Sequence, residues 1–173
     1  MNRTFSVRFI KREEFRIAMA LCWRVFCRFE ADIYGDEGAR SFSNFINDER
    51  LYQVHLAGGF PVAAAYDGGV MIGVAAVRSG PHLSLLFVDE AYQRRGVGRA
   101  LLDYMRDWLV SHDDTGLGGR ERMTVNSSPV GVPFYKAYGF TEEGSAVKKD
   151  GIYYIPMMLR LLESAEGGEG NDH

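Results

Sequence analysis

The sequence predicts an α+β fold in which helices flank a mostly antiparallel sheet. Three strand-like segments follow one another closely at 61–66, 70–77 and 83–88, and the tight-turn sequence Asp67-Gly68-Gly69 separates the first two. An amphipathic helical segment follows the third strand, and further strand-like segments end the domain. With 173 residues, of which 46% are hydrophobic and 25% charged, the chain suits one domain with a sizeable core.

The N-terminal part predicts one strand and two helices. Residues 4–10 alternate between apolar and polar side chains, as a half-buried strand does. Residues 11–30 predict a helix, because apolar side chains recur on one stripe. That stripe contains Phe15, Met19, Trp23 and Phe26. We expect residues 31–38 (ADIYGDEG) to break the helix and 39–47 to form a short second one, whereas 51–56 fits either a helix end or a strand.

Residues 83–110 predict a buried strand, a charged turn and an amphipathic helix that opens at Gly96-Val97-Gly98. The first N–H groups of a helix lack partners within the helix, and their partial positive charge favours an anion. Glycines remove the Cβ atoms that would keep a phosphate away from the backbone. Guanidinium groups around the same turn suit phosphate oxygens, and they belong to Arg94, Arg95 and Arg99.

This turn matches neither of two common phosphate-binding loops. A P-loop requires Gly-Lys-Ser/Thr, but Arg99 and Ala100 follow Gly98. A dinucleotide-binding fingerprint requires a third Gly or Ala, and that position is Leu101. The net charge is −3, so no extended basic surface indicates nucleic acid. The local basic residues suit a small anionic ligand better.

The segment after this helix predicts a loop, a strand and a helix. Residues 111–120 are polar and glycine-rich, as in a loop, and 122–126 predicts a short strand. Ser128 suits the N-cap of the next helix and Pro129 its first position. Gly139 is placed to end that helix.

The last ordered elements are two predicted strands, at 140–143 and 151–161. We expect residues 1–162 to form a single domain. The acidic, glycine-rich residues 163–173 predict a disordered tail.

The cysteines and the apolar runs bear on the cellular compartment. Cys22 and Cys27 lie in one helical segment, about 140° apart around its axis, which disfavours a disulfide between them. Two buried thiols indicate a reducing compartment. The N-terminus lacks an apolar run of signal-peptide length, and no run approaches a membrane span. We therefore expect a cytoplasmic protein without membrane contact.

Residues 93–98 (QRRGVG) resemble the Q/R-x-x-G-x-G/A acyl-CoA motif of the GNAT superfamily, the GCN5-related N-acetyltransferases. Residues 123–129 (MTVNSSP) and 133–140 (PFYKAYGF) are similar to the strand, helix and YxxxGF ending of that family. The order of elements resembles the GNAT fold over roughly residues 4–161. The resemblance implies a sandwich-like αβα arrangement around a mixed, twisted sheet, whose middle strands splay apart to admit pantetheine.

The resemblance also implies that acetyl-CoA is the cosubstrate and that no metal takes part. Phe87 and Val88 match positions whose backbone contacts pantetheine, and 94–99 matches the pyrophosphate loop. Asn126 matches a strand-end residue that often contacts the cofactor, although it could equally cap the next helix. The full set of implied cofactor-binding residues is Phe87, Val88, Gln93, Arg94, Arg95, Gly96, Val97, Gly98, Arg99, Asn126 and Phe134.

The implied reaction is direct attack by an amine on the thioester in a ternary complex, with backbone N–H groups polarising the carbonyl. Tyr135 matches the tyrosine that protonates the departing thiolate in many members, although a core aromatic explains it as well. Tyr138 or Tyr153 could project into the same space. His82 and Glu30 are candidate general bases, and a solvent-exposed position is the alternative for both.

The acceptor is expected to be a small-molecule or peptide amine of unidentified structure. Polar residues of the first half could line its pocket, namely Glu30, Tyr34, Glu37, His82 and Ser84. The acidic residues Glu30, Asp32, Asp36 and Glu37 suggest a cationic acceptor, but a solvated loop explains them equally well. The final strands could pair across a homodimer.

Two other classes of function fit parts of the sequence. A non-catalytic CoA-binding sensor or interaction module would keep the cofactor pocket without turnover. A phosphopeptide or nucleotide binder would use the arginines alone and would show no preference for CoA over ATP.

Overall fold

The computed structural model describes residues 4–112 and 116–162. It confirms the predicted α+β class. The helices are α1 (Phe15–Phe29), α2 (Ala31–Asn47), α3 (Glu49–Leu56), α4 (Val97–Ser111) and α5 (Val132–Tyr138), with short 3-10 turns η1 (Arg12–Glu14) and η2 (Glu90–Tyr92). The strands are β1 (Ser6–Phe9), β2 (Val62–Asp67), β3 (Val70–Arg78), β4 (His82–Val88), β5 (Arg122–Ser127), β6 (Thr141–Glu142), β7 (Val147–Lys149) and β8 (Ile152–Arg160). The predicted tail at 163–173 lies outside the described residues.

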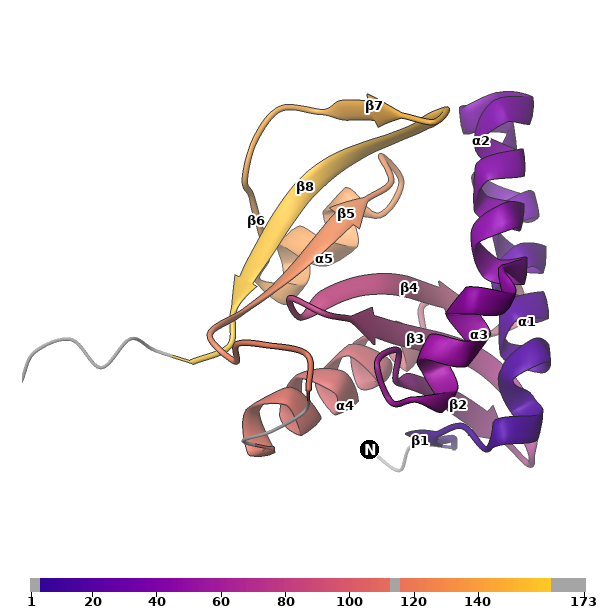
Figure 1. Ribbon diagram of the computed structural model, residues 1–173, viewed down its shortest axis with the longest axis vertical. Coiled ribbons are helices and arrows are strands. Elements are labelled where there is room, and N and C mark those ends of the chain that lie inside the picture. Colours follow the sequence, from indigo (N-terminus) through magenta and orange to yellow (C-terminus); the bar gives the residue numbers. More distant parts are fainter. Residues whose placement is uncertain (1–3, 113–115, 163–173) are drawn as a thin grey trace, which may run out of the picture.

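The described strands form a sheet in the order β1-β2-β3-β4-β5-β8-β6, with β7 paired to β8 (Figure 1). Neighbouring strands are antiparallel except for β4 and β5, which are parallel. Their pairing covers only His82 with Thr124 and Leu83 with Val125. Beyond these pairs β4 and β5 diverge, so the middle of the sheet opens toward their carboxyl ends (Figure 1). The splayed strands implied by the resemblance are therefore present.

Helices cover both faces of the sheet, because residues on a strand alternate between faces. Ala75 and Val77 of β3 belong to the core under α4, together with Leu101 and Met105. The intervening β3 residues belong to a second core under α1. Gly73 permits the close approach of β3 to α4, since a Cβ atom there would lie 2.9 Å from Leu101 Cδ1. The molecule is thus layered as helix, sheet and helix.

The predicted break at 31–38 holds only at Gly35, since the other residues of this segment are helical and belong to α2 (Ala31–Asn47). Gly35, with φ of 70° and ψ of −170°, kinks α2 and separates its two helical segments. Packing compensates for the polar composition, since Phe26 of α1 stacks on Phe42 of α2 with ring centroids 4.3 Å apart. The ambiguous segment 51–56 belongs to α3, whose N-cap Asp48 accepts a hydrogen bond from Arg50 N–H.

Three other expectations need correction. The helix predicted to start at Pro129 begins at Val132, and Ser128 instead accepts a hydrogen bond from Gly131 N–H in the preceding turn. Strand β7 was not predicted, because its stability comes from pairing with β8 rather than from its own polar sequence. Only one of the two free thiols is buried, since Cys22 is inside α1 and Cys27 is exposed.

None of the described helices combines the length and apolarity that a bilayer crossing needs.

Glu14 joins β1, η1 and β2. Its carboxylate accepts two hydrogen bonds from Arg8 (both 2.9 Å), one from the Tyr66 hydroxyl (3.0 Å) and one from Lys11 N–H (2.6 Å). The Arg8 guanidinium, more than the other groups, lowers the pKa of Glu14 from 4.5 to about 2. Because the folded pKa is below the unfolded one, this stabilisation is complete above pH 4.5 and is lost as the pH falls toward 2.

We expect Glu14→Gln to lower the free energy of unfolding by about 1–2 kcal/mol at neutral pH, because it removes charge-assisted hydrogen bonds. The difference from the wild type should narrow as the pH falls through the range set by the two pKa values. Urea unfolding at several pH values measures it. Glu13→Gln, at an exposed neighbouring position, is the matched control. If Glu14→Gln lowers the free energy of unfolding no more than Glu13→Gln does, the Glu14 carboxylate does not stabilise the fold as described.

Candidate functional site

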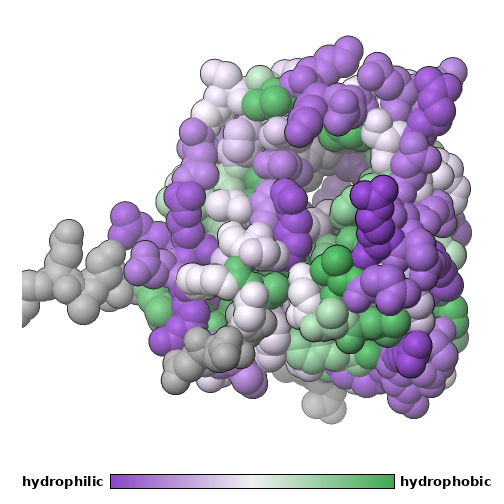
Figure 2. Space-filling view, viewed as in Figure 1, coloured by the Kyte–Doolittle hydropathy of each residue, from purple (hydrophilic) through white to green (hydrophobic). Residues whose placement is uncertain are grey.

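Two cavities meet where β4 and β5 diverge. The α4 cavity, of about 760 Å³, lies between the end of β4, the turn before α4, and α5. The α2 cavity, of about 500 Å³, lies between α2, β4, β5 and the β7–β8 turn. Figure 2 shows the molecule hollowed between β8 and α2, with hydrophilic residues at the rim. Residues common to both cavities are Glu30, Leu86, Phe87, Ser128 and Tyr135.

The N-terminus of α4 opens into the α4 cavity. No side chain of the described residues caps this helix, so its first N–H groups remain available. Gly96, the N-cap, has φ of 81°, and Arg94 has φ of 61°. A non-glycine residue with positive φ is uncommon and often marks a functional site. Successive backbone N–H groups in such a turn form a concave site for an anion.

Side chains around this turn add positive charge and fix the end of β4. Arg94 and Arg99 line the α4 cavity, and the Arg99 guanidinium also stacks over Tyr138 at 5.2 Å. Gln93 Nε2 donates a hydrogen bond to the Val88 carbonyl (3.1 Å). Arg95 instead stacks over Tyr92 at 5.4 Å and does not line the cavity. The turn therefore directs two of the three arginines toward the cavity.

The free edge of β4 lies between the two cavities. Its residues 86–88 pair with β3 on one side, as in Phe87 with Val74. On the other side the pairing with β5 has already ended at Leu83. Backbone groups of a strand without a neighbour are open to an extended ligand. A ligand in either cavity can therefore reach the backbone near Leu86 and Phe87.

Tyr135 reaches the junction from α5. Its side chain is 8% exposed and packs edge-on against Phe134 and Phe140. Burial raises the pKa of Tyr135, and the charge of Glu30 raises it further. The phenol therefore keeps its proton over the ordinary pH range. Its hydroxyl makes no hydrogen bond with the described part of the chain, so it is free to bind a ligand.

Glu30 lies opposite, at the junction of α1 and α2. Burial raises the pKa of Glu30, while the Ser128 hydroxyl lowers it. Burial also raises the pKa of Tyr34, next to the negative charge of Glu30. Glu30 is half-buried and lines both cavities.

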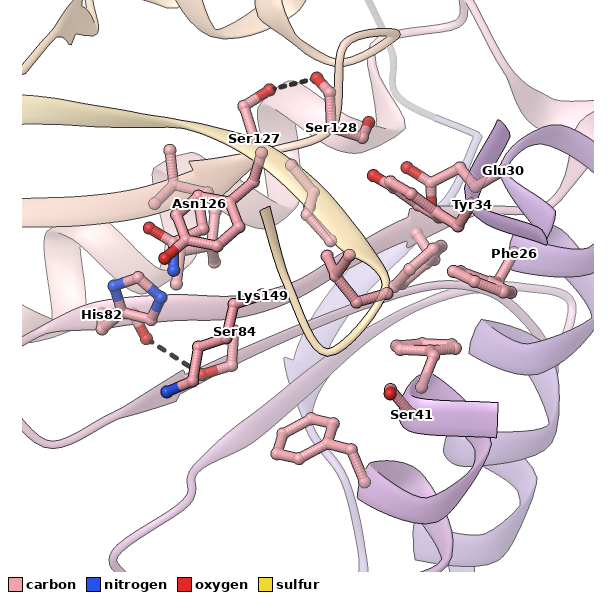
Figure 3. A pocket seen from close by; sticks show the side chains of 18 of the residues that line it. Phe26, Glu30, Tyr34, Ser41, His82, Ser84, Asn126, Ser127, Ser128 and Lys149 are labelled. Atoms are coloured by element: carbon pink, nitrogen blue, oxygen red, sulfur yellow. Dashed lines mark hydrogen bonds between the residues drawn. The ribbon is translucent and has the colours of Figure 1, made fainter. Parts of the chain in front are cut away.

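His82 lies in the α2 cavity, at the far end from Glu30 (Figure 3). Its Nδ1 atom is hydrogen-bonded to Thr124 Oγ1 (2.8 Å). Burial, and secondarily the charge of Arg78, lowers the pKa of His82 from 6.5 to about 4. The imidazole is therefore neutral at physiological pH, which is the form that can accept a proton.

We expect NMR titration of His82 to show a midpoint near 4. Because the folded pKa is depressed, the neutral ring stabilises the fold above pH 6.5, and this contribution is lost as the pH falls through about 4. The His82→Gln variant identifies the resonance by its disappearance. A midpoint at or above 6.5 would show that the ring is not buried in solution.

Residues 30–161 match the family model of the acetyltransferase (GNAT) domain. The chain belongs to the GNAT acetyltransferase family. No curated protein matched its sequence. Solved structures of GNAT acetyltransferases share the fold of this GNAT domain at low sequence identity.

Three of these structures illustrate the likeness. A GCN5-related N-acetyltransferase from Rhodopseudomonas palustris is 22% identical with a TM-score of 0.74, covering 92% of this chain and 98% of that one. The PaiA N-acetyltransferase from Thermoplasma acidophilum, in complex with coenzyme A, is 16% identical with a TM-score of 0.73, covering 92% and 99%. YncA from Salmonella typhimurium, a putative acetyltransferase with acetyl-CoA, is 20% identical with a TM-score of 0.67, covering 94% and 97%.

The cavities of this GNAT domain collect most residues singled out from the sequence. The α4 cavity is lined by Phe87, Val88, Gln93, Arg94, Gly96, Val97, Gly98, Arg99 and Phe134. Asn126 lines the α2 cavity instead, together with His82, Tyr34 and Ser84. Glu37 lines neither cavity. Among the described residues, no group of three or more His, Cys, Asp or Glu side chains could hold a metal ion.

The two rival tyrosines lie elsewhere. The Tyr138 hydroxyl donates to Asp103 (2.6 Å) and accepts from Arg106 (2.9 Å), so it is engaged on α4. Tyr153 is 42% exposed and lines neither cavity. Tyr135 is thus the tyrosine at the junction of the cavities.

Several residues of the α2 cavity were not singled out from the sequence. They include the aromatic residues Phe26, Phe42 and Phe45, and also Arg78 and Lys149. The aromatic residues read as core positions of α1 and α2. Arg78 and Lys149 end strands β3 and β7, and no sequence motif marks either of them.

Proposed function

We infer that this GNAT domain transfers an acetyl group from acetyl-CoA to an amine, by direct attack in a ternary complex. The observation that carries this inference is the meeting of two cavities at the open edge of β4, with Tyr135 and Glu30 at their junction. Only the α4 cavity is lined by the turn before α4, so the two cavities differ in lining as two different substrates require.

The α4 cavity fits acetyl-CoA. The uncapped N–H groups of α4 and the Arg94 guanidinium would hold the diphosphate. Gly98 leaves space at this turn, since a Cβ there would meet only Phe134 and Val88 at ordinary contact distances of 3.5 and 3.7 Å. The free backbone edge of β4 would pair with the pantetheine amides. Acetyl-CoA supplies the acyl group in activated form, as a thioester.

Residues at the junction would supply the proton transfers. Backbone N–H groups at the free edge of β4 would donate hydrogen bonds to the thioester carbonyl oxygen. The Tyr135 phenol would give its proton to the departing sulfur as the C–S bond breaks and the new C–N bond forms. The amine must lose a proton to become a neutral amide, and Glu30 accepts it more readily than an ordinary carboxylate because its pKa is raised. His82 lies farther away, inside the α2 cavity.

Two measurements test this function. Acetyl-CoA should raise the midpoint of thermal unfolding, because a ligand of the folded state stabilises it by mass action. A thiol-release screen over an amine library should show turnover that depends on both acetyl-CoA and an amine. Stabilisation without turnover for any amine would favour a non-catalytic CoA sensor. If acetyl-CoA neither stabilises the protein nor supports turnover with any amine, the proposed function is excluded.

A further inference from the structure

The α2 cavity carries charges of both signs. Its carboxylates are Glu30 and Asp150, its cations are Arg78 and Lys149, and burial keeps His82 neutral. The volume of about 500 Å³ suits a small molecule or a few residues of peptide. The arrangement of these charges therefore bears on what the acceptor carries besides its amine.

The two cations gather at one end of the cavity. Arg78 lies opposite His82 in the β3–β4 register, and its charge contributes to the low pKa of that imidazole. Figure 3 shows the Lys149 side chain extending toward the side of His82 and Ser84, away from Glu30. Neither cation forms an ion pair with any carboxylate of the described ranges. A guanidinium and an ammonium group without a partner favour an anionic oxygen group.

The other end of the cavity suits an amine. Glu30 and Tyr34 lie there, adjacent to the Tyr135 junction (Figure 3). Asp150 lies in the β7–β8 turn next to α2, where the Ser41 hydroxyl donates a hydrogen bond to the Asp150 backbone carbonyl (2.6 Å). No ion pair joins Asp150 to Lys149 within the described residues.

Three phenylalanines form an apolar wall of the cavity. Phe42 stacks on Phe26 with centroids 4.3 Å apart and contacts Phe87 at 5.5 Å. All three line the cavity. Such a wall favours an apolar segment of the ligand over a polar one.

We propose that the acceptor is a zwitterion whose amine and carboxylate are separated by an apolar segment, as in an ω-amino acid or a short peptide. The amine lies at the Glu30 and Tyr135 end, the carboxylate at the Arg78 and Lys149 end, and the apolar segment along the phenylalanine wall. This inference rests on the proposed function, because it takes the α2 cavity as the acceptor site.

The decisive experiment compares three acceptors of equal chain length: ε-aminocaproate, its neutral amide, and the corresponding diamine. We expect kcat/KM to be about 10-fold higher for the carboxylate than for the amide, and lowest for the diamine, at low ionic strength. Added salt should reduce the preference, because both cations are exposed. The measured quantity is the ratio of kcat/KM values, so a change that affects all acceptors alike cancels.

Matched variants assign the preference to the two cations. Combining Arg78→Met with Lys149→Met should bring the ratio of carboxylate to amide close to one. Lys148→Met removes the same charge from the neighbouring residue of β7, which does not line the cavity, and should keep the wild-type ratio. Circular dichroism checks that each variant is folded.

The outcomes separate this proposal from the proposed function. No turnover with any amine would overturn the proposed function itself. Turnover of other amines but of none of these three, or equal rates for the carboxylate and the amide, would overturn the zwitterion proposal alone. A preference for the diamine would also overturn the zwitterion proposal. An unchanged ratio in the double variant would exclude Arg78 and Lys149 as its cause.

Discussion

Replacing Gly98 with aspartate is expected to raise the KM for acetyl-CoA by about 100-fold or more. The side chain would extend from the first turn of α4 into the α4 cavity, where the diphosphate is proposed to bind. It would fill the space that glycine leaves, and its negative charge would oppose that of the phosphates. A carboxylate in the first turn favours the helix dipole, so folding should not suffer. Steady-state kinetics with varied acetyl-CoA gives the KM, and thermal unfolding without ligand checks the fold.

Two further substitutions at the same position separate size from charge. Gly98→Ala should change the KM by no more than about threefold, because its Cβ would make only ordinary contacts with Phe134 (3.5 Å) and Val88 (3.7 Å). Gly98→Asn has the shape of the aspartate without its charge and should lie between the two. If all three variants bind acetyl-CoA as the wild type does, the diphosphate does not bind at α4.

Replacing Tyr135 with phenylalanine is expected to lower kcat by about 100-fold with little change in the KM for acetyl-CoA. The substitution removes the hydroxyl proposed to protonate the thiolate and keeps the ring contacts with Phe134 and Phe140. The hydroxyl has no hydrogen-bond partner in the described chain, so its removal should leave the free energy of unfolding nearly unchanged. Thiol release under saturating substrates measures kcat.

Tyr153→Phe is the control for this experiment. It removes the same atom from an exposed tyrosine that lines neither cavity, and should leave kcat unchanged. The pKa of Tyr135 is raised by burial, so the wild-type rate should not fall through ionisation of this phenol in moderately alkaline solution. A Tyr135→Phe variant with a kcat within about threefold of the wild type would remove this residue from proton delivery.

The local sequence was informative wherever short-range physics decides structure. The glycines and arginines at 93–99, between an apolar strand and an amphipathic helix, predicted a turn followed by a helix with unpaired first N–H groups, and the structure has an uncapped helix N-terminus there. At residues 31–38 the same reasoning predicted the interruption at Gly35 but not the helical segments on either side of it, which depend on aromatic packing between α1 and α2. It also missed β7, which forms only because β8 pairs with it.

The same distinction between local sequence and long-range packing applies to the candidate site. The sequence by itself determined the fold class, the family resemblance and most of the α4 cavity, because one contiguous strand, turn and helix carry that information. Only the tertiary structure decided which tyrosine reaches the junction, that Glu30 is half-buried there, and that Arg78 and Lys149 share a cavity. These residues come from distant elements, and their burial and their charged neighbours depend on how the sheet opens. A local sequence pattern does not predict which distant elements come together in this way.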